Sequence, residues 1–268
     1  MRDAALDLAE QWGWPYYLSI HDYLSEDATI RVSKRWCRGM IVPCAELADE
    51  LKTTLGVPSR LIKVVRPGIR IEDGGDCSAA APRRPLNDGN VPVIGMAGPL
   101  APSAGLLAFL KAAQKVLEQG FDVEFTIAGR PNAAGDVELR KRIERLRLSD
   151  RLTLVLDPAL RSVFWNVLDI YCQPSQAPTT GDFLIRAMAR GIPVIATQVK
   201  SLRGLIHPDG NGLSIPVNDS DALAKAMISL LRDHESARRL GANAREWALA
   251  QFDPQREARE LVELYDDI

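Results

Sequence analysis

Short apolar runs rich in β-branched residues alternate with longer segments of helical periodicity along most of the chain. After residue 90 the apolar positions between these runs recur at helical spacing, as at Leu106, Leu110 and Ala113. Strands that alternate with helices of about 10–15 residues indicate βαβ units, and hence a parallel sheet with right-handed crossovers. The predicted strands of this region are 91–96, 123–128, 152–156, 169–172 and 193–196.

The first 70 residues repeat this alternation on a smaller scale. Strands are predicted at 16–20, 39–42 and 61–65, with a helix over 45–55. Because a doubly wound sheet usually has about five or six strands, three parallel strands would leave one edge unpaired and part of one face uncovered. We therefore expect that a partner completes this sheet or that the domain is incomplete in this chain.

A stretch of loop composition separates the two α/β regions. Residues 72–90 are rich in Gly, Pro, Ala, Asp and Asn, which is typical of a domain boundary. Further on, Asn218-Asp219-Ser220-Asp221 predicts the start of a helix, and the chain is predicted helical from there to its end except near Pro254. The predicted organisation is a first domain at 1–75, a linker at 76–90, a second domain at 91–250 and a terminal helix at 251–268.

Composition and charge exclude several classes of protein. The 268 residues are 46% hydrophobic and 25% charged, with a formal net charge of -2, which is typical of a globular protein and not of an unspecific nucleic-acid binder. No apolar run reaches the ~20 residues of a membrane span, and acidic residues near the start argue against a signal peptide. The four cysteines form no CxxC pair and match no zinc site, which favours reduced thiols in the cytoplasm and no metal cofactor.

Familiar phosphate-binding and hydrolytic motifs are absent. The sequence has no GxxxxGK[ST], GxSxG or HExxH, and its glycine-rich strand-to-helix turn at 95–100 fits GxGxxG poorly. A candidate site is therefore predicted from position, because ligands of open α/β sheets bind beyond the carboxyl ends of the strands. The loops expected there are 97–104, 129–135, 173–182 and 197–204.

Several segments together carry a resemblance to a known family. Their order and spacing are similar to those of the C-terminal, donor-binding domain of family 4 retaining glycosyltransferases, which have the GT-B fold of two Rossmann-like parallel-sheet domains. Residues 15–70 resemble the end of that family's N-terminal, acceptor-binding domain, whose first half has no counterpart here. The matching stretches are VIGMAG at 93–98, FTIAG at 125–129, DIYCQPS at 169–175, AMARGIPVIAT at 187–197 and GNGL at 210–213.

This resemblance implies an architecture, an activity and a set of partners. It implies an α/β, GT-B-like protein with an incomplete N-terminal domain, onto which the terminal helix crosses back. It implies sugar transfer from a nucleotide-sugar donor to a glycan or lipid-linked acceptor, without a metal or other cofactor. We also expect a protein partner at the incomplete sheet. Binding of nucleic acid is not expected, and contact with a membrane is expected to be peripheral at most.

At the donor site the resemblance implies binding positions that lack the family's usual residues. The Arg and Lys that clamp the donor diphosphate in the family correspond to Pro99 and Ala104, and its Glu-x7-Glu pair corresponds to Pro178 and Arg186. Proline and alanine cannot neutralise phosphate charge, and losing one such group typically costs ~10²–10³-fold in rate. We therefore expect little transfer by the isolated chain. The implied donor-binding residues are Gly98, Pro99, Ala104, Gly129, Arg130, Pro178, Gly181, Arg186, Thr197 and Lys200.

Two features leave alternatives open. Arg186, together with Lys200 and neighbouring arginines, forms either a re-sited phosphate pocket or, for its exposed members, ordinary solvated surface. His21 is the candidate catalytic residue, because it matches a His that follows a strand in the family and would position the sugar or acceptor. The alternative is a strand-end His bonded to Asp22 or to the local backbone.

Three functions remain open at this point. The first is a glycosyltransferase of the family 4 type, and the second is an inactive or split homologue that binds and stabilises an active transferase. The third is a fragment with no present role. Consistent core patterns, helix caps and turns after residue 90 favour a chain that folds.

Overall fold

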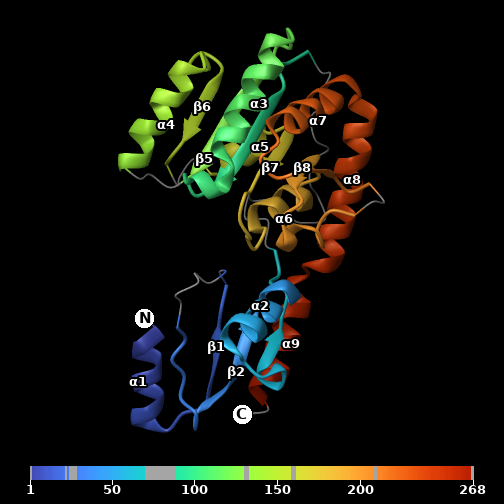
Figure 1. Cartoon of the computed structure of the whole chain (residues 1–268). Helices are drawn as coiled ribbons and strands as arrows, with labels where there is room; N and C mark the ends of the chain where they lie inside the picture. The colour runs from blue at the N-terminus through green and yellow to red at the C-terminus, as the bar shows by residue number, and fades with distance from the viewer. Residues whose placement is uncertain are drawn as a thin grey trace. The chain divides into compact units, whose positions relative to one another are not determined.

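A computed structural model describes residues 2–21, 23, 29–69, 89–129, 133–157, 161–207 and 210–266. The chain divides into two compact units. The first comprises Met1–Arg70 and Gln251–Ile268, and the second comprises Ile71–Ala250. Each unit has its own parallel sheet (Figure 1).

The second unit contains a six-stranded parallel sheet in the order β6-β5-β4-β7-β8-β9. All five strands predicted after residue 90 are confirmed, and β9 is an additional strand of three residues. The strands are β4 (Val93–Gly98), β5 (Glu124–Gly129), β6 (Leu152–Val155), β7 (Ile170–Gln173), β8 (Val194–Thr197) and β9 (Leu213–Ile215).

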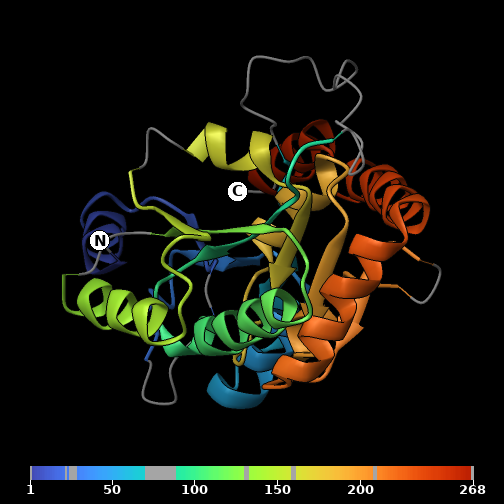
Figure 2. The same cartoon turned by 90° about the horizontal axis from the view of Figure 1, so that it is seen from above.

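Helices cover both faces of this sheet, α3, α4 and α7 on one face and α5 and α6 on the other (Figure 2). The edge of the Phe109 ring meets Phe125 at 6.0 Å inside the first layer, where α3 also packs against α7. The predicted start of α7 is confirmed, because Asp219 Oδ1 accepts a hydrogen bond of 2.8 Å from the Ala222 amide. The helices are α3 (Leu106–Glu118), α4 (Ala133–Arg145), α5 (Arg161–Val167), α6 (Asp182–Ala189), α7 (Ser220–Arg232) and α8 (His234–Gln251).

The first unit contains a three-stranded parallel sheet in the order β1-β2-β3, so among the described residues β1 is an edge strand that pairs with β2 alone. Its small core forms where the sheet packs against α2, around the buried Met40, Val42, Leu47 and Leu51. The strands predicted in this region are confirmed, whereas α1 was not predicted. The elements are β1 (Tyr16–Ser19), β2 (Cys37–Val42), β3 (Ile62–Val64), α1 (Arg2–Trp12), α2 (Ala45–Leu55) and α9 (Pro254–Asp266).

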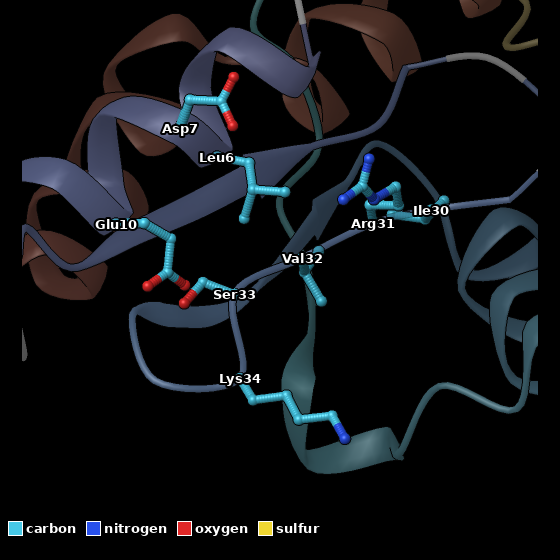
Figure 3. Close-up of a pocket in the computed structure, with 8 residues that line it drawn as sticks. All are labelled: Leu6, Asp7, Glu10, Ile30, Arg31, Val32, Ser33 and Lys34. Carbon is cyan, nitrogen blue, oxygen red and sulfur yellow. The ribbon is translucent and has the colours of Figure 1, made fainter.

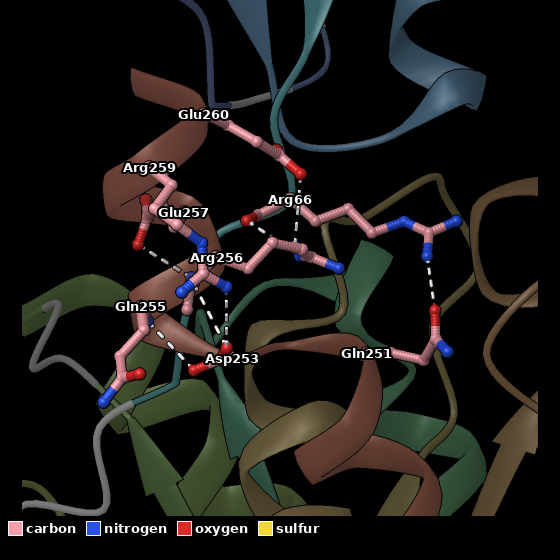
Figure 4. A network of polar contacts seen from close by, with 9 residues as sticks. Arg66, Gln251, Asp253, Gln255, Arg256, Glu257, Arg259 and Glu260 are labelled. Carbon is pink, nitrogen blue, oxygen red and sulfur yellow. Dashed lines mark hydrogen bonds and ion pairs between the residues drawn. The ribbon is translucent and has the colours of Figure 1, made fainter. Parts of the chain in front are cut away.

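Helix α9 is held on the first unit by polar contacts with the segment after β3 (Figure 4). The Gly68 amide donates to Glu257 Oε2 at 2.8 Å, and Arg256 Nη2 donates to the Arg66 carbonyl oxygen at 3.3 Å. Gly68 also lies so close to Pro254 that a Cβ there would collide with it. None of the described side chains of α9 is fully buried, and the ring of Tyr265 adds an edge contact with Tyr17 at 5.9 Å between ring centres. No helix among the described residues is long and apolar enough to cross a bilayer.

Candidate functional site

The strand order of the second unit creates a topological switch point between β4 and β7. From β4 the chain proceeds to β5 and β6 on one side, whereas β7, β8 and β9 continue on the other. Connections that leave in opposite directions open a crevice at the carboxyl ends of the two central strands, which is where open α/β sheets bind ligands. The candidate site is therefore flanked by the loop after β4 and the loop after β7.

Backbone contacts bring these two loops together. The Gln176 amide, after β7, donates to the Ser103 carbonyl oxygen, after β4, at 2.8 Å. Gly105 adopts φ = 81°, and a Cβ at this position would collide with the Pro174 carbonyl. Only glycine fits there, because the left-handed conformation and the close approach both exclude a side chain.

Two helices begin at the switch point without a side-chain cap. Gly105 is the N-cap of α3 and Gly181 is the N-cap of α6, and both are left-handed. The amides in the first turn of a helix lack intrahelical partners, and the helix dipole makes this end favourable for negative charge. An anion such as a phosphate group at the crevice could accept hydrogen bonds from these amides.

The loop after β8 (Val194–Thr197) is joined to the same region by hydroxyl groups. Thr197 Oγ1 donates to the Ser175 carbonyl oxygen at 2.7 Å, and the Thr179 amide donates to Ser201 Oγ at 3.0 Å. Thr197, Ser175 and Ser201 are all buried. The loops after β7 and β8 are therefore fixed to each other from within.

A buried chain of side chains underlies this part of the sheet. Tyr171 Oη donates to Gln173 Oε1 at 2.6 Å and contacts the Ala97 carbonyl oxygen of β4 at 3.3 Å, and Gln173 Nε2 donates to Ser175 Oγ at 2.8 Å. Burial raises the pKa of the Tyr171 phenol well above its usual value, and burial likewise raises the pKa of the Cys172 thiol. Both groups stay neutral, so neither supplies charge to the site.

The glycines and small residues predicted for the donor site lie at the carboxyl edge of the sheet. Gly98 and Gly129 are paired in register on β4 and β5, and a Cβ at Gly129 would crowd Leu100. Ala104 is buried in the core of the unit, and Gly181 leaves no room for a Cβ beside Leu205. These residues shape the loops, whereas Pro99, Pro178 and Lys200 are exposed.

The predicted cationic residues are distributed unevenly. Arg186 is half-buried on α6, and its guanidinium has no hydrogen-bond or ion-pair partner within the described parts of the chain. The Arg190 guanidinium lies 5.2 Å from the centre of the Trp165 ring, so it packs on an aromatic face. Arg203 Nε donates to the Gln198 carbonyl oxygen at 3.2 Å.

The remaining predicted site residues are His21, in the first unit, and Arg130, which the structure does not describe. His21 follows β1 and is exposed, and its imidazole makes no hydrogen bond with another described residue. Asp22 and Arg130 lie outside the described residues, so the alternative in which His21 pairs with Asp22 stays untested and the role of Arg130 stays a prediction. Three His, Cys, Asp or Glu side chains suitable for a metal do not gather anywhere in the described ranges.

A separate cavity of about 570 Å³ lies in the first unit (Figure 3). It opens between α1 and the segment before β2, and its two acidic side chains are balanced by two basic ones. The site prediction named no residue of this cavity. It is lined by Leu6, Asp7, Glu10, Ile30, Arg31, Val32, Ser33 and Lys34.

Sequence reasoning missed the polar residues that join the loops, namely Ser103, Gln173 and Ser201. The one available signal was Gln173 itself, a polar residue that ends the apolar run of β7. Ser103 and Ser201 give no such signal, because serine is ordinary in loops and their partners are distant in sequence.

Comparisons with known proteins agree with this geometry. Residues 79–247 match the family model described as "Glycosyl transferases group 1". The D-inositol 3-phosphate glycosyltransferase of Corynebacterium urealyticum is 30% identical over 267 residues, with 91% of this chain and 62% of that protein aligned. The putative colanic acid biosynthesis glycosyltransferase WcaL of Salmonella typhimurium is 28% identical, with 85% of this chain and 57% of that protein aligned.

Solved structures show the same fold at lower identity. Alr3699/HepE of Anabaena, in complex with UDP and glucose, superposes with a TM-score of 0.84 at 19% identity, covering 99% of this chain and 75% of that one. The C-terminal domain of LpcC from Francisella tularensis superposes with a TM-score of 0.57 at 21% identity, covering 67% of this chain and 99% of that domain. The chain spans about half to three-fifths of the length of the curated relatives named above.

Proposed function

The chain belongs to the group 1 glycosyl transferases and has the GT-B architecture, and from this premise we propose that its second unit binds the nucleotide end of a nucleotide-sugar donor. The proposed site is the crevice at the carboxyl ends of β4 and β7. The observation that carries the proposal is the switch point itself, at which α3 and α6 both begin without a side-chain cap. The amides of their first turns would donate hydrogen bonds to a diphosphate.

The proposed reaction is retaining transfer of the family 4 type, from the nucleotide-sugar to a glycan or lipid-linked acceptor, with no metal or other cofactor. Gly98, Gly129 and Gly181 would let the backbone approach the donor closely. Arg186 would supply positive charge, because its half-buried guanidinium has no partner among the described residues. His21 would act on the sugar or acceptor side of the reaction.

Weak transfer by the chain alone is part of the proposal. Pro99 and Ala104 stand where the resembling family has charged residues, and Ala104 packs into the core. Backbone amides and Arg186 can bind a diphosphate in the ground state, but the departing nucleotide would lack cations at positions 99 and 104 to neutralise the charge developing on it. We therefore expect measurable nucleotide binding by the isolated chain but only slow sugar transfer.

The test is a calorimetric titration of the purified chain with UDP, GDP and their sugars, followed by transfer assays. Arg186→Glu should weaken nucleotide binding about 10- to 100-fold, the effect of one charge-assisted hydrogen bond. Arg140→Glu on α4, an exposed cation outside the site, is the matched control and should leave binding unchanged. Unaltered affinity in Arg186→Glu would remove Arg186 from the site, and no binding by the parent chain would refute the proposal.

A second function is favoured by the edge of the first sheet. Within the described parts of the chain strand β1 pairs with β2 alone, and Trp12 and Trp14 nearby are 53% and 62% exposed. Large exposed aromatics beside an edge strand are typical of a protein-binding surface. As an inactive or split homologue, the chain would stabilise an active transferase through this surface. Sedimentation of the chain with a purified group 1 transferase, and the turnover of that enzyme with and without the chain, separate the two functions.

A further inference from the structure

The buried chain formed by Tyr171, Gln173 and Ser175 has more polar character than the interior of a sheet requires. Tyr171, Gln173 and Ser175 are 0%, 6% and 3% exposed. A leucine at position 173 would fill a similar volume and need no hydrogen-bond partner, whereas each buried polar group costs free energy unless it is paired. The polar side chain of Gln173 is therefore best explained by the groups that its amide holds in place through hydrogen bonds.

The two ends of the Gln173 amide have different roles, because one accepts a hydrogen bond and the other donates one. Its oxygen accepts the Tyr171 hydroxyl proton at 2.6 Å, and its nitrogen donates to Ser175 Oγ at 2.8 Å. Ser175 Oγ thus serves as an acceptor and keeps its own proton to donate.

Ser175 lies where β7 passes into the loop that leads to α6. Thr197 Oγ1 holds its carbonyl oxygen at 2.7 Å, so both the side chain and the main chain of Ser175 are fixed. The next residues make the contacts that close the switch point, from the Gln176 amide to Ser103 and from the Thr179 amide to Ser201. A shift of Ser175 would therefore displace the loop that ends at the N-terminus of α6.

We propose that Gln173 is a positioning residue of the donor site. Its amide sets the Ser175 hydroxyl and the loop from 174 to 181, and thereby the amides of α6 toward the nucleotide diphosphate. This proposal rests on the function proposed above, but its effect on the loop is measurable without a nucleotide.

Gln173→Leu is the direct test, with Thr126→Val as its control. Thr126 is 4% exposed on β5 of the same sheet and takes no part in the hydrogen bonds that link Tyr171, Gln173 and Ser175. We expect Gln173→Leu to weaken UDP or GDP binding about tenfold, the effect of losing the hydrogen bonds of one neutral side chain, with a melting temperature close to that of Thr126→Val. Equal affinities in the two variants would overturn the proposal.

Gln173→Glu gives a pH profile that simple packing would not produce. A protonated glutamate can accept from Tyr171 and donate to Ser175 as glutamine does, whereas the ionised form can only accept. Burial raises the pKa of such a carboxyl, so the affinity of Gln173→Glu relative to the parent chain should recover as the pH falls from about 8 to about 5.5. A ratio that stays constant with pH would contradict the directional role of the amide, including in the case where Gln173→Leu does not fold.

Amide hydrogen exchange separates this inference from the proposed function. In Gln173→Leu the peptide covering 174–181 should lose protection, whereas a peptide within α7 (Ser220–Arg232) should keep it. If the parent chain binds no nucleotide and this loss is still observed, the donor site fails and the positioning of the loop stands. Unchanged exchange in 174–181 would refute the positioning role whatever the nucleotide result.

Discussion

Gly105 carries the closest approach between the two central loops. Its φ of 81° and the Pro174 carbonyl beside it both exclude a Cβ. Gly120 has the same φ of 81° but open space around it. Comparing substitutions at Gly105 and Gly120 therefore separates the cost of the left-handed backbone conformation from the cost of steric collision.

We predict that Gly105→Ala lowers the free energy of unfolding by about 3 kcal/mol or more, because conformational strain and overpacking add. Gly120→Ala should lower it by about 1 kcal/mol, from strain alone. Urea denaturation of both variants measures the difference. Equal losses would mean that the loop after β7 moves aside, and that the close approach at Gly105 is not fixed.

Because of Tyr171, we expect the free energy of unfolding of the second unit to depend on pH in the alkaline range. Its pKa is raised by burial in the folded protein, so above the ordinary phenol pKa of about 10 the unfolded chain has lost a proton that the folded chain retains. Stability should therefore fall as the pH rises above that value, by up to about 1.4 kcal/mol per pH unit for one proton. Tyr171→Phe should show a smaller fall in urea denaturation from about pH 9 to 11. Parallel curves for the two proteins would contradict this.

At the scale of elements, the attachment of α9 depends on few contacts. None of its described side chains is fully buried, and the hydrogen bond from the Gly68 amide to Glu257 is one of the contacts that hold it. Glu257→Ala should destabilise the first unit by about 1–2 kcal/mol, the range for a hydrogen bond to a charged group. The exposed Glu263 on the same helix is the control. Fluorescence of Trp12, Trp14 and Trp36 reports the unfolding of this unit, and equal effects of the two substitutions would show that the contact is unimportant.

The sequence predicted elements better than it predicted how they pair. Strands were recognisable because they lie in runs of about four to six mostly apolar or β-branched residues, as the three residues of β3 do within 61–65, whereas β9 has a serine at its centre and the seven residues of α5 are too few to show a period. Helix α1 has three acidic residues interspersed among its apolar ones, which obscures a helical apolar period in the sequence. The neighbouring positions of β4 and β7 join residues more than seventy apart, and no local pattern records such a pairing.

The candidate site was predicted in the same uneven way. Its glycines were found because a resemblance marked their positions, and the loops were found because strand ends are visible in the sequence. The contacts of Gln173 with Tyr171 and Ser175 depend on side-chain direction along β7, which follows from alternation once the strand is known. The contacts of Ser103 and Ser201 depend on loops meeting in space, which composition does not reveal.

For the whole molecule, the two units provide separate reporters of ligand binding. A ligand that binds one folded unit stabilises that unit by mass action, by about 2.7 kcal/mol at 100 times its Kd. We predict that UDP or GDP at such a concentration raises the unfolding transition of the second unit (Ile71–Ala250) and leaves that of the first unit in place. Differential scanning calorimetry measures both. A nucleotide-dependent shift confined to the first unit would move the binding site away from β4 and β7.

The first unit is interrupted in the chain, because residues 251–268 belong with residues 1–70. During synthesis the second unit is therefore fully made before the last helix of the first unit leaves the ribosome. Until then the segment after β3 lacks the partners that α9 supplies, and the early unit is exposed to proteases and chaperones. Translation that stops before residue 254 should accordingly leave a product whose N-terminal part is degraded first, while its later part survives.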